Sequence, residues 1–384
     1  MDFANEFIDQ IRGKKTQLLH LLERHEPNET ESRLREKLSA HWHELPQAKS
    51  SDFLEFSVDS SSARRSLVNG TDVFIVRALM LGSNGSQFKK VEFDAMRGIT
   101  DDDLASKLER ILRDLIEIQI VVENCPESTD GLVLIDGNLY GRYTHLMEQI
   151  PVPGREHLPL LLFEAMQKMF EACRQKRIVV VGVSKSSKTR ALSSAFLKEL
   201  GHQQETMDIP DVEMLYRWKQ GEKGFTTPLV LGDYAFRDEA QTMREEPEKY
   251  LRRYFRDLPN YLWNWGIEVI EKVPLAPAIA MFHMVPEWGE QPLRIDVPVS
   301  CLGMDDQILN ISPSRFADSY VVEDVLKQLL MDRGGTDVYN ALLYVVDREV
   351  RLSSQVVDTV YRSILGRELG ISIEYDRSTR RFYR

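Results

Sequence analysis

Two acidic residues follow apolar segments of strand length, and both could bind a metal ion. Asp59 ends the segment FLEFSVD, and Asp136 ends the segment GLVLID. If the two strands are neighbours in one sheet, their carboxylates lie at the same sheet edge, within reach of one divalent cation. Magnesium and manganese prefer such oxygen ligands. An Asp at a strand end can equally cap the following turn, so neither residue alone decides between the two roles.

Further acids lie between and after this pair. A long helical pattern follows the acidic run at residues 101–103 and carries Asp114, Glu117 and Glu123, although helical acids are more often simply solvated. Near the end of the chain, ALLYVVDREV places Asp347 after an apolar stretch on a predicted helix, where it could also mark the polar face. The order strand Asp, helix Glu, strand Asp, late-helix Asp is the order in which RNase H-like nucleases assemble their two-metal sites.

The segments around these acids predict an α/β fold, a mixed sheet flanked by helices. FLEFSVD, TDVFIVRALML and QFKKVEFDAMRGI predict three consecutive strands with short links, which favour an antiparallel meander. The helix, the buried strand GLVLID, a helix at about 157–175 and the buried strand RIVVVGVSK follow. PLRIDVPVSC predicts a later strand, and the chain is mainly helical from about residue 322.

The same patterns divide the chain into three parts. Residues 1–45 form a helical N-terminal arm, because apolar residues recur there at helical spacing. Residues 46–355 form the main domain, with an insertion at about 203–290 where prolines punctuate short aromatic segments. Residues 356–384 form a C-terminal helix and tail.

Charge and composition restrict the class of protein. The formal net charge of −11 opposes a uniformly basic surface for nucleic acid, although a carboxylate metal site adds negative charge and a partner can supply the basic track. The three cysteines lie far apart without a CxxC pair, which predicts neither a zinc site nor a disulfide framework. With no signal peptide or membrane-spanning segment, we expect a cytoplasmic protein.

Four segments resemble, in order and approximate spacing, the motifs of the NurA family of DNA-end-processing nucleases. They are FSVDSSS, LVLIDGNLYGRY, VVVGVSKSSKTR and PLRIDVP, and the resemblance spans about residues 45–355. The family's Asp-Gly-Ser is Asp59-Ser60-Ser61 here, and its Asp-Gly-Ser-Leu is Asp136-Gly137-Asn138-Leu139.

The resemblance implies an RNase H-like fold, a homodimer, and a manganese- or magnesium-dependent nuclease that acts on DNA ends beside a HerA-type hexameric translocase, in repair or in defence against foreign DNA. The implied metal ligands are Asp59, Glu117 or else Glu123, Asp136, and Asp347 in place of the family's usual His. Two metals held by shared carboxylates would activate water and stabilise the leaving oxygen. The candidates for contacting DNA are Lys185, for a phosphate, and Tyr140, Arg142, Tyr143 and Lys188.

Two alternatives stay open. GVSKSSKT lies between a buried strand and a predicted helix, as a phosphate-binding loop does, with Lys188 as its lysine and Asp233 as a magnesium ligand. The motif needs glycine immediately before that lysine, and Ser187 stands there. The chain could also be an inactive adaptor that docks on a hexameric ATPase, since its acidic balance and the segment RRYFRDLPNYLWNWG fit such a subunit.

Overall fold

The computed structural model describes residues 3–22, 29–48, 53–125, 131–202, 207–335 and 338–376. The chain forms two compact units, residues 1–41 and residues 42–384. The first unit contains α1 (Phe3–Gly13), α2 (Lys15–Leu22) and α3 (Glu29–Ala40). Throughout the described part of the chain, every helix is too short or too polar to cross a membrane.

The second unit is built on one large mixed sheet. Its strands run in the spatial order β1-β7-β9-β10-β6-β5-β2-β3-β4, and β8 and β11 pair beside β9. The strands are β1 (Trp42–His43), β2 (Leu54–Ser66), β3 (Asp72–Gly82), β4 (Gln87–Met96), β5 (Gly131–Asp136), β6 (Ile178–Ser184), β7 (Gly224–Thr226), β8 (Leu229–Leu231), β9 (Ile279–Val285), β10 (Leu293–Pro298) and β11 (Arg315–Phe316). A mixed sheet flanked by helices was expected from the sequence, and this part of the prediction is confirmed.

The first three long strands form the expected meander, and two parallel strands extend it. β2 pairs antiparallel with β3, and β3 pairs antiparallel with β4. β5 then lies parallel to β2, and β6 lies parallel to β5. Parallel strands need a crossover, and α4 (Asp102–Glu123) and α6 (Leu158–Gln175) supply it before β5 and before β6.

The helix α4 forms where the sequence predicts it. Asp101 caps its N-terminus by accepting a hydrogen bond from the backbone N–H of Leu104 at 2.8 Å. One stripe of the helix is buried against the sheet and α6, namely Leu104, Leu108, Ile111, Leu115 and Ile118. Burying such a stripe supplies most of a helix's stability in a folded protein, so α4 is held at a fixed position over β2 and β3.

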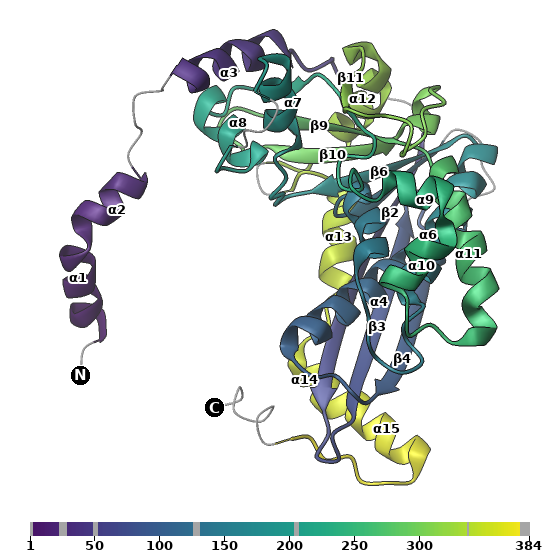
Figure 1. Cartoon of the computed structure of the whole chain (residues 1–384). Coiled ribbons are helices and arrows are strands. Elements are labelled where there is room, and N and C mark those ends of the chain that lie inside the picture. The colour runs from purple at the N-terminus through teal and green to yellow at the C-terminus, as the bar shows by residue number, and fades with distance from the viewer. Residues whose placement is uncertain are drawn as a thin grey trace. The chain divides into compact units, whose positions relative to one another are not determined.

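Alternate residues of β2 face different helices. Ser60 and Ser62 point toward α4, because their hydroxyl groups donate to Glu117 and Glu109. Glu55 and Ser61 point to the other face, which is covered by α13 (Ala341–Val350): Glu55 accepts from Asn340, the N-cap of that helix. Asp59 lies on the α13 face with them. Figure 1 shows α13, in yellow, alongside these strands.

The remaining helices surround the sheet and its ends. They are α5 (Leu139–Tyr143), α7 (Ala191–Glu199), α8 (Asp211–Lys219), α9 (Ala240–Glu245), α10 (Pro247–Tyr254), α11 (Trp263–Lys272), α12 (Glu323–Met331), α14 (Ser354–Val356) and α15 (Arg362–Leu369). A core of apolar side chains from β5, β6, β9 and β10 packs against α12 and α13. The segment 203–290, expected to be an insertion, contributes β7, β8 and β9 to this sheet, and β9 is buried along its whole length.

Candidate active site

Asp59 and Asp136 lie side by side on neighbouring strands. The parallel ladder between β2 and β5 pairs Leu54 with Gly131 and ends with Val58 opposite Ile135, so the next residues along the two strands are Asp59 and Asp136. Paired residues of parallel strands point to the same face, and neighbouring strands are about 4.8 Å apart. The two carboxylates therefore lie on one face of the sheet, near enough for the charge of Asp136 to raise the pKa of Asp59.

One detail of the prediction for Asp59 is wrong. The sequence suggested that its strand ends there, but β2 continues to Ser66 because β3 pairs with it along that whole length. Only the parallel partner stops, since β5 ends at Asp136. The site therefore lies where β5 ends and β2 runs on, which leaves room beside β2 for side chains from α4 and α5.

Glu117 enters this space from α4 and is bound on both of its oxygens. Its Oε1 accepts a hydrogen bond from the Ser60 hydroxyl, and its Oε2 pairs with Nη2 of Arg142. The same guanidinium nitrogen donates to the carbonyl oxygen of Asp136 at 3.0 Å. Glu123, the alternative candidate, is half exposed and pairs with Lys90 at 2.5 Å. Of the two acids, the structure brings Glu117 to Asp59.

The carboxylates carry more negative charge than the chain's own cations neutralise. Burial, together with the charges of Glu117 and Asp136, raises the pKa of Asp59 to about 8. Burial also raises the pKa of Glu117, against the opposing effect of Arg142. The pKa of Asp136 is raised by burial and by the negative charge of Asp347 on α13, and Lys185 opposes the shift. Groups that repel one another in this way favour an added cation.

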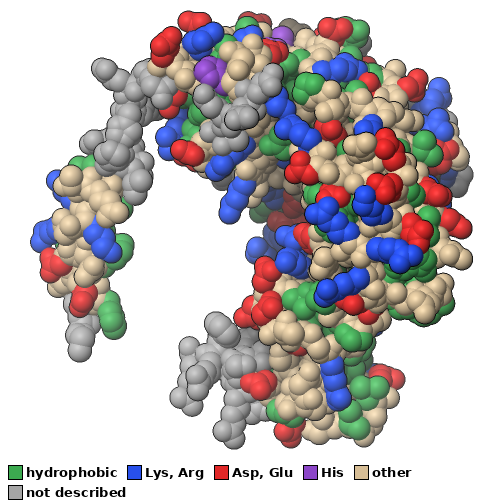
Figure 2. All heavy atoms as spheres, viewed as in Figure 1, with side chains coloured by type: hydrophobic (Ala, Val, Ile, Leu, Met, Phe, Trp, Pro, Cys, Tyr) green, Lys and Arg blue, Asp and Glu red, His purple; other side chains and the backbone are tan. Residues whose placement is uncertain are grey.

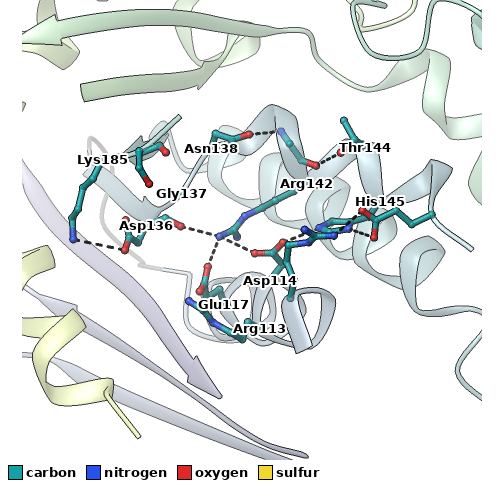
Figure 3. Close-up of a pocket in the computed structure, with 15 residues that line it drawn as sticks. Arg113, Asp114, Glu117, Asp136, Gly137, Asn138, Arg142, Thr144, His145 and Lys185 are labelled. Atoms are coloured by element: carbon teal, nitrogen blue, oxygen red, sulfur yellow. Dashed lines mark hydrogen bonds and ion pairs between the residues drawn. The ribbon is translucent and has the colours of Figure 1, made fainter. Parts of the chain in front are cut away.

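A cleft of about 480 Å³ opens beside these acids. The acid and base side chains that line it are Arg110, Arg113, Asp114, Glu117, Asp136, Arg142, His145, Glu148 and Lys185 (Figure 3). Asp59 is 3% exposed and contacts one of them, since its Oδ1 lies 4.0 Å from Nη2 of Arg113. The cleft thus combines a carboxylate group suited to a hard metal ion with cations suited to a phosphate.

The sequence of residues 55–311 matches the model of one protein family, described as the NurA domain. The chain belongs to the NurA family. The resemblance found in the four motifs is thereby confirmed.

Solved NurA structures share the fold. The crystal structure of the NurA nuclease from Sulfolobus solfataricus is similar over 95% of this chain and 97% of that one, with 15% identity and a TM-score of 0.61. A second crystal structure of NurA matches over 95% and 97% of the two chains, with 12% identity and a TM-score of 0.50. At such low identity the likeness shows the fold alone. No curated protein matches the sequence.

The other residues predicted for the metal and DNA contacts lie in different surroundings. Lys185 follows β6, lines the cleft and lies 3.9 Å from Asp136. Its ammonium group also lies over the ring of Tyr339, 4.9 Å from the centroid. Asp347 is partly buried on α13, and its charge acts on Asp136 and on Tyr339, whose pKa is raised by burial and by these acids. Lys188 is exposed in the loop before α7.

The prediction that Tyr140 and Tyr143 contact DNA is overturned. Their exposed fractions are 4% and 0%. The Tyr140 hydroxyl donates to the carbonyl of Gly232 at 2.8 Å and accepts from the N–H of Ala235, and the Tyr143 ring packs against two phenylalanines. Neither ring can stack on a base without leaving the core. Arg142 is equally buried, and its guanidinium forms an ion pair with Glu117.

Several residues at the site were not predicted from the sequence. Arg113 and His145 line the cleft, and Nε2 of His145 lies 3.0 Å from Asp114. Burial opposes a charged imidazole, but Asp114 and Glu148 raise the pKa of His145 overall. Asp296, in the motif PLRIDVP, is fully buried and accepts the backbone N–H of Tyr140 at 3.0 Å, which fixes the start of α5 beside Asp136. The signal available for that role was an Asp on a buried strand two residues after Arg294, which pairs with it at 2.8 Å.

The structure offers no phosphate-binding loop at GVSKSSKT. Position 182 requires glycine, because a Cβ atom there would lie 2.7 Å from the carbonyl oxygen of Gly137. A phosphate at the N-terminus of α7 would need that helix's first N–H groups. Those of Leu192 and Ser193 already donate to the buried carboxylate of Asp211, at 2.9 and 3.0 Å. This geometry argues against an ATPase built on Lys188.

Proposed function

We propose that this NurA-family chain is a metal-dependent DNA nuclease that hydrolyses phosphodiester bonds in the cleft at the end of β5. One observation carries the proposal. Asp59 and Asp136 occupy matching positions on neighbouring parallel strands, and their charges are not neutralised by the residues around them. Membership of the NurA family supports the same function.

The donor atoms suit a manganese or magnesium ion. Both ions take carboxylate oxygens. Burial and the charges of Glu117 and Asp136 raise the pKa of Asp59, so a bound cation would favour its ionised form. Among the described residues no three His, Cys, Asp or Glu side chains are arranged to hold a metal, and Glu117 is bound by Arg142 and Ser60. We propose Asp59 and Asp136 as the primary ligands. The NurA resemblance adds Glu117 and Asp347, and Glu117 would have to give up its contact with Arg142 to reach the metal.

The metal would supply an activated water and would stabilise the leaving oxygen, with two ions sharing the carboxylates. The chain's own residues do the rest. Asp59 and Asp136 fix the position of the positive charge, and Arg142 holds Glu117 beside them. Lys185, half exposed on the cleft wall, binds a phosphate of the DNA strand.

The strand order and the family support three further proposals. The order of a meander, a helix and two parallel strands, with a strand Asp, a helix Glu, a strand Asp and a late-helix Asp along the chain, supports an RNase H-like nuclease. Family membership supports a homodimer that works beside a HerA-type hexameric ATPase on DNA ends. Acidic and basic side chains are interspersed over the face shown in Figure 2, and a partner could contribute to the basic track for DNA.

The test is degradation of linear DNA by the purified protein with manganese or magnesium. We expect cleavage that stops with EDTA and with Asp59→Ala or Asp136→Ala. Asp103→Ala is the control, because that side chain is exposed at the start of α4 and pairs with Lys107. Cleavage that survives both Asp59→Ala and EDTA refutes the proposal. ATP hydrolysis lost with Lys188→Ala would support the ATPase, and binding to a hexameric ATPase without any cleavage would support the adaptor.

A further inference from the structure

Two half-exposed cations stand beside the carboxylate pair, and they come from different elements. Lys185 follows β6 and lies 3.9 Å from Asp136. Arg113 projects from α4, one turn before Glu117, and lies 4.0 Å from Asp59. Figure 3 shows Lys185 on one side of Asp136, with Arg113, Glu117 and Arg142 on the other. Each contact is at the long end of the range for an ion pair, so each cation keeps capacity for another partner.

Arg113 is held in place by contacts that leave part of its guanidinium unused. Its Nε lies 3.3 Å from the hydroxyl of Ser60, and its Nη2 lies 3.2 Å from the carbonyl oxygen of Ser60. Neither contact uses Nη1. The side chain is 43% exposed and lines the cleft. It is therefore oriented by the backbone of β2 while it remains open to a ligand.

Arg113 also acts on the charges of the site, although weakly. Its positive charge lowers the pKa of Asp59, Asp114, Glu117 and Asp136, but in each case its effect is smaller than the effect of burial and of at least one other charged neighbour. Arg142 carries the same charge and also lines the cleft, but it is 5% exposed and its guanidinium is already bound to Glu117. Arg110 reaches the cleft as well, but its guanidinium pairs with Glu148 at 2.9 Å. Arg113 is the arginine whose contacts leave it available beside the pair.

Hydrolysis of a phosphodiester needs such a group. A water oxygen forms a bond to phosphorus and loses a proton to solvent, while the bond to the leaving sugar oxygen breaks. The sugar oxygen takes the electron pair of that bond and then a proton from solvent. The nonbridging oxygens carry negative charge throughout, and charge builds on the leaving oxygen as its bond breaks. The planar fork of an arginine stabilises phosphate oxygens by two parallel hydrogen bonds, and fixed donors of this kind act in the transition state.

We propose that Arg113 is a catalytic residue of this chain, and that it binds a nonbridging oxygen of the scissile phosphate opposite Lys185. This rests on the nuclease function proposed above. Arg113 transfers no proton and holds no metal. Its guanidinium supplies the positive charge on the α4 side of the cleft, where Glu117 would otherwise repel the phosphate, and its Nη2 reaches to 4.0 Å from Asp59.

The experiment compares Arg113→Ala, Arg113→Lys and the matched control Arg174→Ala. Arg174 is an arginine of similar exposure on α6, and it pairs with Glu171 on its own helix. Cleavage of linear DNA is measured with manganese, so that kcat and KM are separated, and manganese binding is measured by electron paramagnetic resonance. Circular dichroism and thermal melting report whether each variant is folded.

Arg113→Ala is expected to lower kcat by about 10²- to 10³-fold, the usual loss for one transition-state donor, with little change in KM. Arg113→Lys recovers part of kcat, because it restores the charge without the fork. Manganese binding is unchanged or tighter, since a cation beside Asp59 has been removed, and Arg174→Ala behaves as the wild type.

Three results overturn the proposal. If Arg113→Ala keeps the wild-type kcat while Asp59→Ala is inactive, the nuclease function stands and the role of Arg113 falls. If Arg113→Ala loses manganese binding and Arg113→Lys restores nothing, the residue only positions Ser60 and Asp59. If the wild-type protein cleaves no DNA with either metal, the proposed function and the role of Arg113 fall together.

Discussion

Replacing Asp59 by Asn is expected to stabilise the metal-free protein while abolishing its activity. Asp59 is 3% exposed, and its pKa is raised to about 8 by burial and by the charges of Glu117 and Asp136. At pH 7 the folded protein must therefore keep this acid largely protonated, whereas the unfolded chain ionises it. Each pH unit above the ordinary aspartate pKa of 3.8 contributes about 1.4 kcal/mol, so the destabilisation at pH 7 is about 4 kcal/mol.

Asn removes this cost and keeps the local contact. The Oδ1 of Asp59 accepts the backbone N–H of Ser60 at 2.7 Å, and an amide oxygen accepts it equally well. For a chain of 384 residues, 4 kcal/mol corresponds to an increase in Tm of about 5 °C. Because the pKa is raised, the cost is absent below pH 3.8 and grows until about pH 8. The gain of the variant should therefore increase with pH over that range.

The assay is thermal unfolding in EDTA at several pH values, with Asp103→Asn as the exposed control. Manganese should then raise the Tm of the wild-type protein and have a smaller effect on Asp59→Asn, because a ligand that binds only the folded state stabilises it. A lower Tm for Asp59→Asn in EDTA at pH 7 would refute the reasoning, since it would show that the carboxylate is already neutralised within the chain.

Three other outcomes follow from buried acids and from the loop before α7. Burial and Asp332 raise the pKa of Glu55 to about 8, so the wild-type protein should lose stability as the pH rises from 5 to 8. Glu55→Gln should reduce this loss, as measured by urea unfolding at each pH. Asp211→Ala should destabilise the protein by about 2 kcal/mol, because it leaves the N–H groups at the start of α7 without their acceptor; an unchanged urea midpoint would contradict this. Lys188→Ala should leave any trace of ATP hydrolysis in the preparation unaltered, and a loss that follows the variant would restore the ATPase alternative.

The fold was predictable where local patterns agree with tertiary packing. The apolar stripe after Asp101 predicts α4, and alternation with short turns predicts the meander. The segment 203–290 was harder, because β7, β8 and β9 are short strands between prolines, and their burial depends on pairing with strands distant in sequence. Sequence periodicity carries no information on such pairings.

The acids of the candidate site were easier to find than its cations, and the reason is physical. A carboxylate after a buried strand is conspicuous, because charge is costly there unless it is bound or paired. An arginine on a helix is usually solvated, so Arg113 and Arg142 look alike in the sequence. The structure separates them by burial: Arg142 is enclosed and bound to Glu117, whereas Arg113 remains half exposed beside Asp59.

Tyr140 and Tyr143 failed as DNA contacts for a related reason. They follow Asp136 by four and seven residues, but closeness in sequence to a site residue does not place a side chain beside the ligand of that residue. The short helix α5 turns both rings into the core, and Asp296 fixes that turn through the N–H of Tyr140. The conspicuous residues after the second motif therefore hold the end of β5 in place. The surface that meets DNA must then be sought among the half-exposed side chains of the cleft, where Lys185 and Arg113 flank the two acids.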